Sequence, residues 1–456
     1  MAGFDANSRL TMFSPGRPIR CSAGVYHVGP ILLVGLAMTA WPAWCRAQSI
    51  ESYFPSGVAG SEQQLGVTVL SRQRPLYEAP GIQLDGFTVR PRIDQSIFYN
   101  SNVNAVPGSS SLGSSTAASV SATSNWVRNS LSMSVGMNNL RYFSFPAENH
   151  TDWNLGIGGG YTIADSQLIF AYSHQSIHQL GTTLGTLRSQ TPALNRTDSV
   201  LTAYTFQFGD LAITPDASVS ANRFGTATVS GVPLSQRVFD NNVLAGGLTA
   251  RYSRGETGGL LLVARALAAN YINPQPGFPS NDYNSFAILG GFDYQAEGVL
   301  RYRLLAGLEV RSFAAPQVGT STSPSIEGSV VWTPTGLTTL TGFLSRRIEP
   351  PQTFGLNGYV LTQSRIVIDH EYMRNVFLQA RASAQLAQYL PRGSQTNFTV
   401  GAGVSWLLNR RLRLSLDYDF TRQSAISNGG GTTGRVLLVS GQYVQSLATL
   451  TLHVAL

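Results

Sequence analysis

The sequence predicts an all-β fold, a transmembrane antiparallel β-barrel of about 16–18 strands, from its composition and its alternation of apolar and polar residues. The 456 residues are 43% hydrophobic and 10% aromatic but only 12% charged, which argues against disorder. All 31 basic residues are arginine, and glycine, serine and threonine outnumber the strong helix formers, which argues against a long helical protein. Single barrels are also an exception to the rule of roughly 150 residues per domain.

The first residues have the order of a secretory signal peptide. Arg17 and Arg20 precede the apolar run "VGPILLVGLAMTAWPAW", which is followed by "CRAQ". We place cleavage after Ala47, so that residues 1–47 form the signal peptide. A membrane anchor is the competing interpretation, while the bulky Trp44 argues against lipidation of Cys45.

The processed chain has no cysteine, because Cys21 and Cys45 both precede the cut. This excludes disulfides, thiolate catalysis and cysteine-ligated zinc. The formal charge of +7 falls to +4, since the signal carries four arginines and one aspartate. So small an excess does not predict a nucleic-acid partner.

Residues 48–84 lack the alternation and contain "SRQRPLYEAPG". We expect a periplasmic extension there, or a plug segment that enters the barrel mouth. Residues 85–456 are expected to form the barrel.

The clearest strand is "RLRLSLDYDF", in which Leu412 to Phe420 alternate with charged and small residues. Successive strand side chains point to opposite faces, so this segment has one face for lipid and one for water. The same pattern occurs in "RYRLLAGLEVR", "NFTVGAGVSW", "VFLQARASAQL" and "ATLTLHVAL". A soluble sandwich also alternates, but segments of about 10 residues that end in aromatics, following an export signal, favour a membrane barrel.

Connections rich in Gly, Ser, Pro and Asn are expected to form surface loops: "VPGSSSLGSSTAAS", "GTTLGTLRSQTPALN" and "NPQPGFPSND". Short turns such as "LLNRRL" are expected at the opposite rim.

Charged residues on the polar faces are candidates to line a water-filled lumen, where they would either guide a polar or anionic solute or brace the wall through ion pairs. The candidates are Arg301, Arg303, Glu309, Arg311, Arg365, Asp369, Arg381, Arg411, Arg413, Asp417 and Asp419.

One segment, "LIFAYSHQSIHQL", places His174 and Ser176 on the same face of a strand. The pair resembles the His-x-Ser element of outer-membrane phospholipases and lipid A deacylases, in which the histidine activates the serine. Those enzymes continue with Asn-Gly, whereas Ile177 and His178 stand here, and Asn195 or Asp198 is the only partner to suggest. We therefore expect no catalytic residues.

No cofactor or metal is expected. The histidines are scattered, and in Asp369 to Glu371 adjacent strand residues point in opposite directions. The run "GIGGG" lacks the lysine of a phosphate loop and is interpreted as close strand packing.

The opening "VRPRIDQSIFYNSNV", the repeated strands and the late "LDYDFTRQSAIS" resemble the putative beta-barrel porin-2 family of Gram-negative outer-membrane proteins, over about 85–456. Many members look like components of exopolysaccharide production. The resemblance therefore implies a barrel that passes a secreted polysaccharide, with no catalytic residues to carry over.

We expect an outer-membrane channel without enzymatic activity, passing a hydrophilic solute, above all a secreted exopolysaccharide, through an arginine-bearing lumen. Its partners would be outer-membrane lipid and lipopolysaccharide, the polysaccharide or a smaller hydrophilic solute, and periplasmic export components. The alternatives are a lipolytic enzyme that uses Ser176 and His174, and a non-conducting scaffold.

Overall fold

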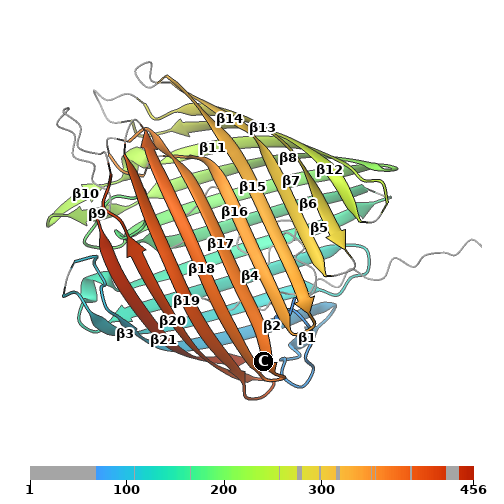
Figure 1. Ribbon diagram of the computed structural model, residues 1–456, viewed down its shortest axis with the longest axis horizontal. Coiled ribbons are helices and arrows are strands. Elements are labelled where there is room, and N and C mark those ends of the chain that lie inside the picture. The colour runs from blue at the N-terminus through green and yellow to red at the C-terminus, as the bar shows by residue number, and fades with distance from the viewer. Residues whose placement is uncertain are drawn as a thin grey trace, which may run out of the picture. The chain divides into compact units, whose positions relative to one another are not determined.

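The computed structural model describes residues 68–106, 108–164, 166–255, 257–274, 280–296, 299–314, 319–350, 352–354, 356–390, 393–427 and 441–456 (Figure 1). All of them fall within one unit, Gly35–Leu456. The predicted signal peptide, residues 1–47, lies outside the described residues, as do residues 48–67.

The alternating segments form long strands. Their bounds are β1 (Ile82–Leu84), β2 (Phe87–Asn100), β3 (Ser111–Ser124), β4 (Ser130–Tyr142), β5 (His150–Ile163), β6 (Ser166–Gln179), β7 (Ala193–Phe208), β8 (Leu211–Phe224), β9 (Thr226–Val229), β10 (Val232–Ser235), β11 (Asn241–Tyr252), β12 (Gly258–Tyr271), β13 (Tyr283–Ala296), β14 (Leu300–Phe313), β15 (Thr320–Thr335), β16 (Thr338–Glu349), β17 (Gly358–Met373), β18 (Val376–Leu390), β19 (Ser394–Leu407), β20 (Leu412–Gln423) and β21 (Tyr443–Ala455). Two short 3-10 helices, η2 (Pro146–Glu148) and η3 (Arg237–Phe239), lie in connections. In the described part of the chain, no helix is long and apolar enough to cross a membrane.

Eighteen of these strands, β2–β8 and β11–β21, form a closed antiparallel barrel. Each pairs with its neighbour in the chain, and β8 pairs with β11 because β9 and β10 form a separate hairpin. The first and last strands close the barrel, from Arg92 opposite Ala455 to Asn100 opposite Leu447. Closure satisfies the backbone groups that an open edge would expose to lipid, so the predicted fold class is confirmed at the upper end of its strand range.

The outer face of the barrel is apolar. Along β20, Leu416 and Tyr418 are exposed, whereas Ser415, which precedes Leu416, is buried. Of the aromatic residues that end alternating segments of the sequence, Trp126, Trp153, Trp332 and Trp406 are exposed and Phe420 is half-buried. Large apolar side chains exposed along strands of this length are typical of a surface in contact with lipid, while the polar residues that alternate with them face inward.

The connections differ between the two ends of the barrel. One end, here called the short-turn rim, carries 125–129, 164–165, 209–210, 253–257, 297–299, 336–337, 374–375 and 408–411. The other, the long-loop rim, is the end at which the strands joined by residues 101–110, 143–149, 180–192, 225–240, 272–282, 314–319, 350–357, 391–393 and 424–442 meet these connections. The tightest turns need glycine, as at Gly209, whose φ of 58° is left-handed.

Two of the loop predictions were wrong. Most of "VPGSSSLGSSTAAS" belongs to β3, because its small polar residues pair with β2 from Ser111 onward. The segment "GTTLGTLRSQTPALN" does connect β6 to β7, but Leu184 and Leu187 are buried, so it is not a surface loop. The third segment, "NPQPGFPSND", connects β12 to β13, with residues 275–279 outside the described residues, and "LLNRRL" turns at the short-turn rim as predicted.

Candidate functional site

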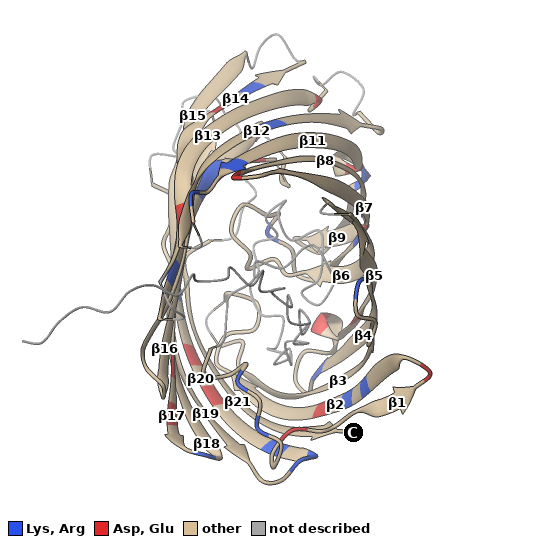
Figure 2. Cartoon of the chain, turned by 90° about the vertical axis from the view of Figure 1, so that its right-hand side faces the viewer, with Lys and Arg blue, Asp and Glu red and all other residues tan. Residues whose placement is uncertain are grey.

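The inner face of the barrel carries charged side chains on many strands. Figure 2 looks into the ring of strands and shows basic and acidic positions distributed around it. The sequence-predicted charged residues fall into three groups: a bridge over β19, a buried pair on β14, and separate arginines.

The first group centres on Arg381 of β18. Its Nε and Nη2 donate to the two oxygens of Asp419 at 2.7 and 2.6 Å, and its Nη1 donates to Asp417 Oδ1 at 3.0 Å. Nη1 also donates to Gln379 Oε1 at 3.2 Å, and Gln379 Nε2 donates to Asp369 Oδ1 at 2.7 Å. The structure thus joins three of the predicted lumen residues, Arg381, Asp417 and Asp419, by direct hydrogen bonds. It connects a fourth, Asp369, through the side-chain amide of Gln379.

This bridge crosses the whole of β19, which lies between β18 and β20. Gly401 is the register partner of both Arg381 and Asp419, and Gly403 faces Asp417. A Cβ at Gly401 would lie 2.1 Å from Asp419 Oδ1 and 2.7 Å from Arg381 Nε. The two glycines therefore leave the space through which the guanidinium reaches the carboxylates.

Similar cross-strand pairs recur on the inner wall. Arg251 of β11 binds Asp293 of β13 at 3.0 Å, across β12 beside Gly259. Arg265 of β12 binds Glu327 of β15. Neither pair could be recognised in the sequence, because the partners come from segments more than 40 residues apart.

The second group, Glu309 and Arg311, is almost inaccessible. Arg311 is 2% exposed, and its Nη2 donates to Glu309 Oε1 at 3.0 Å and to the carbonyl of Ile348 at 2.7 Å. Its guanidinium also lies 4.2 Å from the ring centre of Tyr283. Such a covered pair fixes packing near the long-loop rim and does not present a free charge to a solute.

The remaining predicted arginines are dispersed. Arg303 faces Asp293 across the β13–β14 ladder, and Arg413 faces His453 across β20 and β21. Arg301 donates to Gln295, whereas Arg365 shares the inner face of β17 with Asp369. Arg411 is exposed in the turn that precedes β20 and is not on a strand.

A hydrogen-bonded chain of Asp94, His453 and Ser415 lies on three neighbouring strands, β2, β21 and β20. His453 Nδ1 is 2.7 Å from Asp94 Oδ1 and its Nε2 is 2.9 Å from Ser415 Oγ. However, Arg92 Nη2 also lies 2.8 Å from His453 Nδ1, and Ser415 is buried. The backbones of the strands around Ser415 are engaged in ladder pairs with their neighbours, so no pair of N–H groups is available there to bind an oxyanion. We therefore interpret this hydrogen-bonded series as a structural brace of the barrel wall.

The histidine and serine that sequence analysis weighed as a lipolytic pair lie on the outer face of β6. Asp198 does bind His174, at 2.7 Å from Nδ1. Trp153 stacks on the His174 ring with centres 4.5 Å apart, and Nε2 is a buried atom with no partner among the described residues. Because Ser176 is not bonded to His174, the described geometry lacks the contact by which a base activates a nucleophile.

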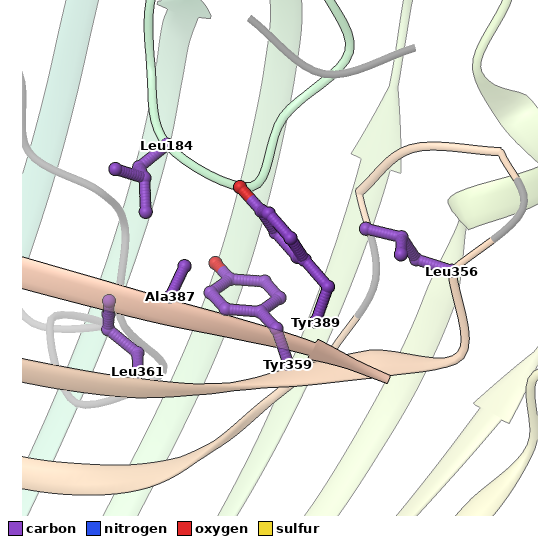
Figure 3. Packing of buried hydrophobic residues seen from close by; sticks show 6 residues of the cluster. All are labelled: Leu184, Leu356, Tyr359, Leu361, Ala387 and Tyr389. Atoms are coloured by element: carbon purple, nitrogen blue, oxygen red, sulfur yellow. The ribbon is translucent and has the colours of Figure 1, made fainter. Parts of the chain in front are cut away.

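The loop between β6 and β7 folds against the inner wall. Leu184 packs with Leu356, Leu361 and Ala387 and with two tyrosines, Tyr359 and Tyr389, whose rings are 5.9 Å apart. Figure 3 shows Leu184 close to the side chains of Tyr359 and Leu361 on β17 and Ala387 and Tyr389 on β18, with Leu356 on the connection that precedes β17. Loop residue Thr182 also accepts a hydrogen bond from Tyr443 Oη at 3.4 Å. Apart from the leucines themselves, no feature of the sequence indicates this inward course.

At the short-turn rim, residues 68–74 lie against the inner face of β16–β18. The Val69 N–H donates to Thr339 Oγ1 at 2.9 Å, and Arg74 Nη2 binds Glu371 Oε2 at 2.7 Å. The Arg74 guanidinium also lies 4.5 Å from the ring centre of Phe377. The chain then pairs through β1 with the start of β2.

The described residues contain no group of three or more histidine, cysteine, aspartate or glutamate side chains that could hold a metal ion. The glycine run at 156–160 packs closely: a Cβ at Gly159 would lie 2.6 Å from the carbonyl of Ser130 and 2.8 Å from Phe170. At the long-loop rim, burial raises the pKa of Glu148 in η2 to about 7.

The chain matches a family of known proteins over most of its length. The family model described as putative beta-barrel porin 2 matches residues 74–440. No curated protein matches.

Among solved structures, OccAB3 of Acinetobacter baumannii is 9% identical, with 81% of this chain and 99% of that chain covered at a TM-score of 0.43. OccK2 of Pseudomonas aeruginosa is 11% identical, with 81% and 98% covered at 0.44. A BenF-like porin from Pseudomonas fluorescens Pf-5 is 11% identical, with 82% and 100% covered at 0.43. At this level of similarity these structures assign no substrate to the chain.

Proposed function

The chain belongs to the putative beta-barrel porin 2 family, and on that basis we propose that this Gram-negative outer-membrane channel passes carbohydrate, in particular a secreted exopolysaccharide. Outer-membrane barrels carry short periplasmic turns and long extracellular loops, so the long-loop rim is assigned to the cell surface.

The observation that carries the proposal is the chemistry of the inner wall. Guanidinium and carboxylate groups face one another in the Arg381 and Arg251 bridges, and the same inner wall carries hydroxyl pairs such as Ser96 with Thr451 and Thr399 with Thr421. Alternating donors and acceptors suit sugar hydroxyls, which can exchange water for such partners at little net cost. Because each guanidinium is paired with a carboxylate, the wall should not bind an anionic solute so tightly that the solute cannot leave.

The inward β6–β7 loop supports a selective conduit over a wide open pore. Since Leu184 is held by Tyr359 and Tyr389, the loop takes up part of the cross-section at the long-loop rim. We propose that this loop sets the size limit for the passing chain.

Residues 48–84 are proposed to act as a plug at the periplasmic mouth. The contacts of Val69 and Arg74 with Thr339 and Glu371 support this, because they hold the described end of the segment against the inner wall.

Single-channel recording in planar bilayers tests the proposal, with neutral and uronate-containing oligosaccharides of increasing length added to one side. A conduit for polysaccharide predicts transient current blocks whose duration increases with chain length and depends on the side of addition. Exclusion of everything above a disaccharide would overturn the polysaccharide assignment while leaving a small-solute channel. A folded protein that carries no current, with or without residues 48–84, would favour the non-conducting scaffold.

A further inference from the structure

Two arginines face each other on the outer, lipid-facing side of the barrel. Arg196 of β7 is the register partner of Arg223 of β8. Four residues further along the same two strands, Val200 and Val219 are also register partners, and both are exposed on the outer face. Because side chains alternate along a strand, the two arginines share that face.

Folding alone does not account for this pair. Like charges directly opposite each other in an antiparallel ladder destabilise it, and arginine on the lipid face adds up to about 1 kcal/mol even near the interface. Both costs would fall if an anion lay between the guanidinium groups.

The hydrogen-bond partners of the two arginines carry no negative charge, and the nearby Asp198 acts on Arg223 only through space. Arg223 Nη1 donates to the carbonyls of Asn222 and Asn241 at 2.8 and 2.9 Å, and Nη2 donates to Asn242 Oδ1 at 2.7 Å. These acceptors are neutral and hold the guanidinium in place. The Arg196 side chain is exposed and makes no ion pair or hydrogen bond within the described ranges.

Asp198, the acid on the same face, already has other partners. Its Oδ1 lies 2.7 Å from His174 Nδ1 and accepts from Tyr172 Oη at 2.9 Å. No ion pair joins Asp198 to either arginine in the described structure.

The position of the pair points to a lipid headgroup. Arg223 is the next-to-last residue of β8 and Arg196 the fourth of β7, so both lie at strand ends near the long-loop rim. Trp153, exposed on β5, is aligned with them through Ser176, and tryptophan favours the membrane interface.

The other outer-face arginines of the described strands lie at the same rim. Each is within four residues of the strand end that meets the long loops: Arg141, Arg346 and Arg422. Within the described strands, the outward-facing arginines thus lie at the level assigned to the outer leaflet.

We propose that Arg196 and Arg223 form a binding site for a phosphate group of the outer-leaflet glycolipid. Guanidinium groups bind phosphate through paired, charge-assisted N–H donors, and Arg223 is already oriented by its three hydrogen bonds. The acyl chains of the same lipid would then lie over the apolar surface that begins at Val200 and Val219. This site is independent of what passes through the lumen.

Native mass spectrometry of the detergent-solubilised full-length protein tests the site, with bisphosphorylated lipid A, dephosphorylated lipid A and inorganic phosphate as probes. We expect bisphosphorylated lipid A to bind at least tenfold more tightly than the other two. The double variant Arg196→Gln, Arg223→Gln should lose that advantage.

Arg346→Gln is the matched control, because Arg346 lies on the same face and rim but is bonded to Thr362 and Gln388 at 2.7 and 3.1 Å. It should keep most of the preference, and heat-dependent mobility on gels would show that each variant is folded. Equal binding of lipid A by the double variant, or equal binding of dephosphorylated lipid A by the wild type, would overturn the site. Tight binding of inorganic phosphate with no advantage for lipid A would overturn the lipid assignment.

Discussion

The guanidinium of Arg381 reaches Asp419 across an intervening strand, with two hydrogen bonds of 2.7 and 2.6 Å that pass over Gly401. The interaction couples β18 to β20 directly, in addition to the ladder that each makes with β19. The alternating polar face therefore does more than contact water. Its arginines bond to acids on strands that are not their neighbours, through the space that its glycines leave.

Gly401→Ala should break this bridge. A Cβ there would lie 2.1 Å from Asp419 Oδ1, and losing hydrogen bonds between charged groups costs about 1.5–3 kcal/mol. We expect the urea midpoint of the refolded barrel to fall accordingly. Gly290→Ala is the control, because nothing lies within 4 Å of a Cβ at that strand position, and it should not lower the midpoint. Equal midpoints for the two variants would contradict the bridge.

Leu184→Ala should release the inward loop. Leu184 is 2% exposed, and truncating such a leucine costs about 2–5 kcal/mol, which weakens the apolar contact that docks the tip of the loop on Tyr359 and Tyr389. We expect larger single-channel conductance and a higher size limit for sugars. Val232→Ala, at an exposed position in the hairpin of the same rim, should change neither. An unchanged conductance in the Leu184 variant would show that the loop does not limit the pathway.

Glu371→Gln should loosen the segment at the short-turn rim, because it removes the carboxylate that Arg74 binds at 2.7 Å. We expect faster proteolysis between residues 68 and 84 and longer open times in bilayer recordings. Glu327→Gln also removes an inner-wall acid paired with arginine but does not touch this segment, so it serves as the control. If proteolysis near residue 74 is no faster than in the control, Arg74 does not anchor the segment.

Stability should depend on pH through Glu148. Burial raises the pKa of its carboxyl from 4.5 to about 7, so the folded protein retains a proton that the unfolded chain releases. The free energy of unfolding should therefore fall as the pH rises from about 4.5 to about 7, by on the order of 3 kcal/mol, and then level off. Urea titrations of wild type and Glu148→Gln check this by difference. Parallel pH profiles for the two proteins would argue against the raised pKa.

Several features could be predicted from the chain alone, because they depend on local order. The strict alternation around Leu416 and Leu308 defines two faces, and both leucines are exposed on the outer wall as expected. Strand number and family followed from the same repeated pattern, whereas the barrel strands, at 12–16 residues, are longer than the segments of about 10 residues that the pattern predicted. The polar face of "NFTVGAGVSW" could also be recognised in the sequence, but the role of its glycines, which leave space for the Arg381 bridge, could not.

Contacts between distant segments could not be predicted, because alternation fixes which face a side chain takes but not its neighbours across the barrel. Arg381 was recognised as inward-facing, yet only the register of β18, β19 and β20 brings it to Asp419. The loop with Leu184 was expected at the surface because its polar composition resembles other loops, and the apolar contact that overrides this comes from tyrosines some 175 and 205 positions away. The sequence by itself thus determined a closed sheet with an apolar outside and a polar inside, whereas the tertiary structure decided which charges pair, because pairing depends on the registers of strands that are far apart in the chain.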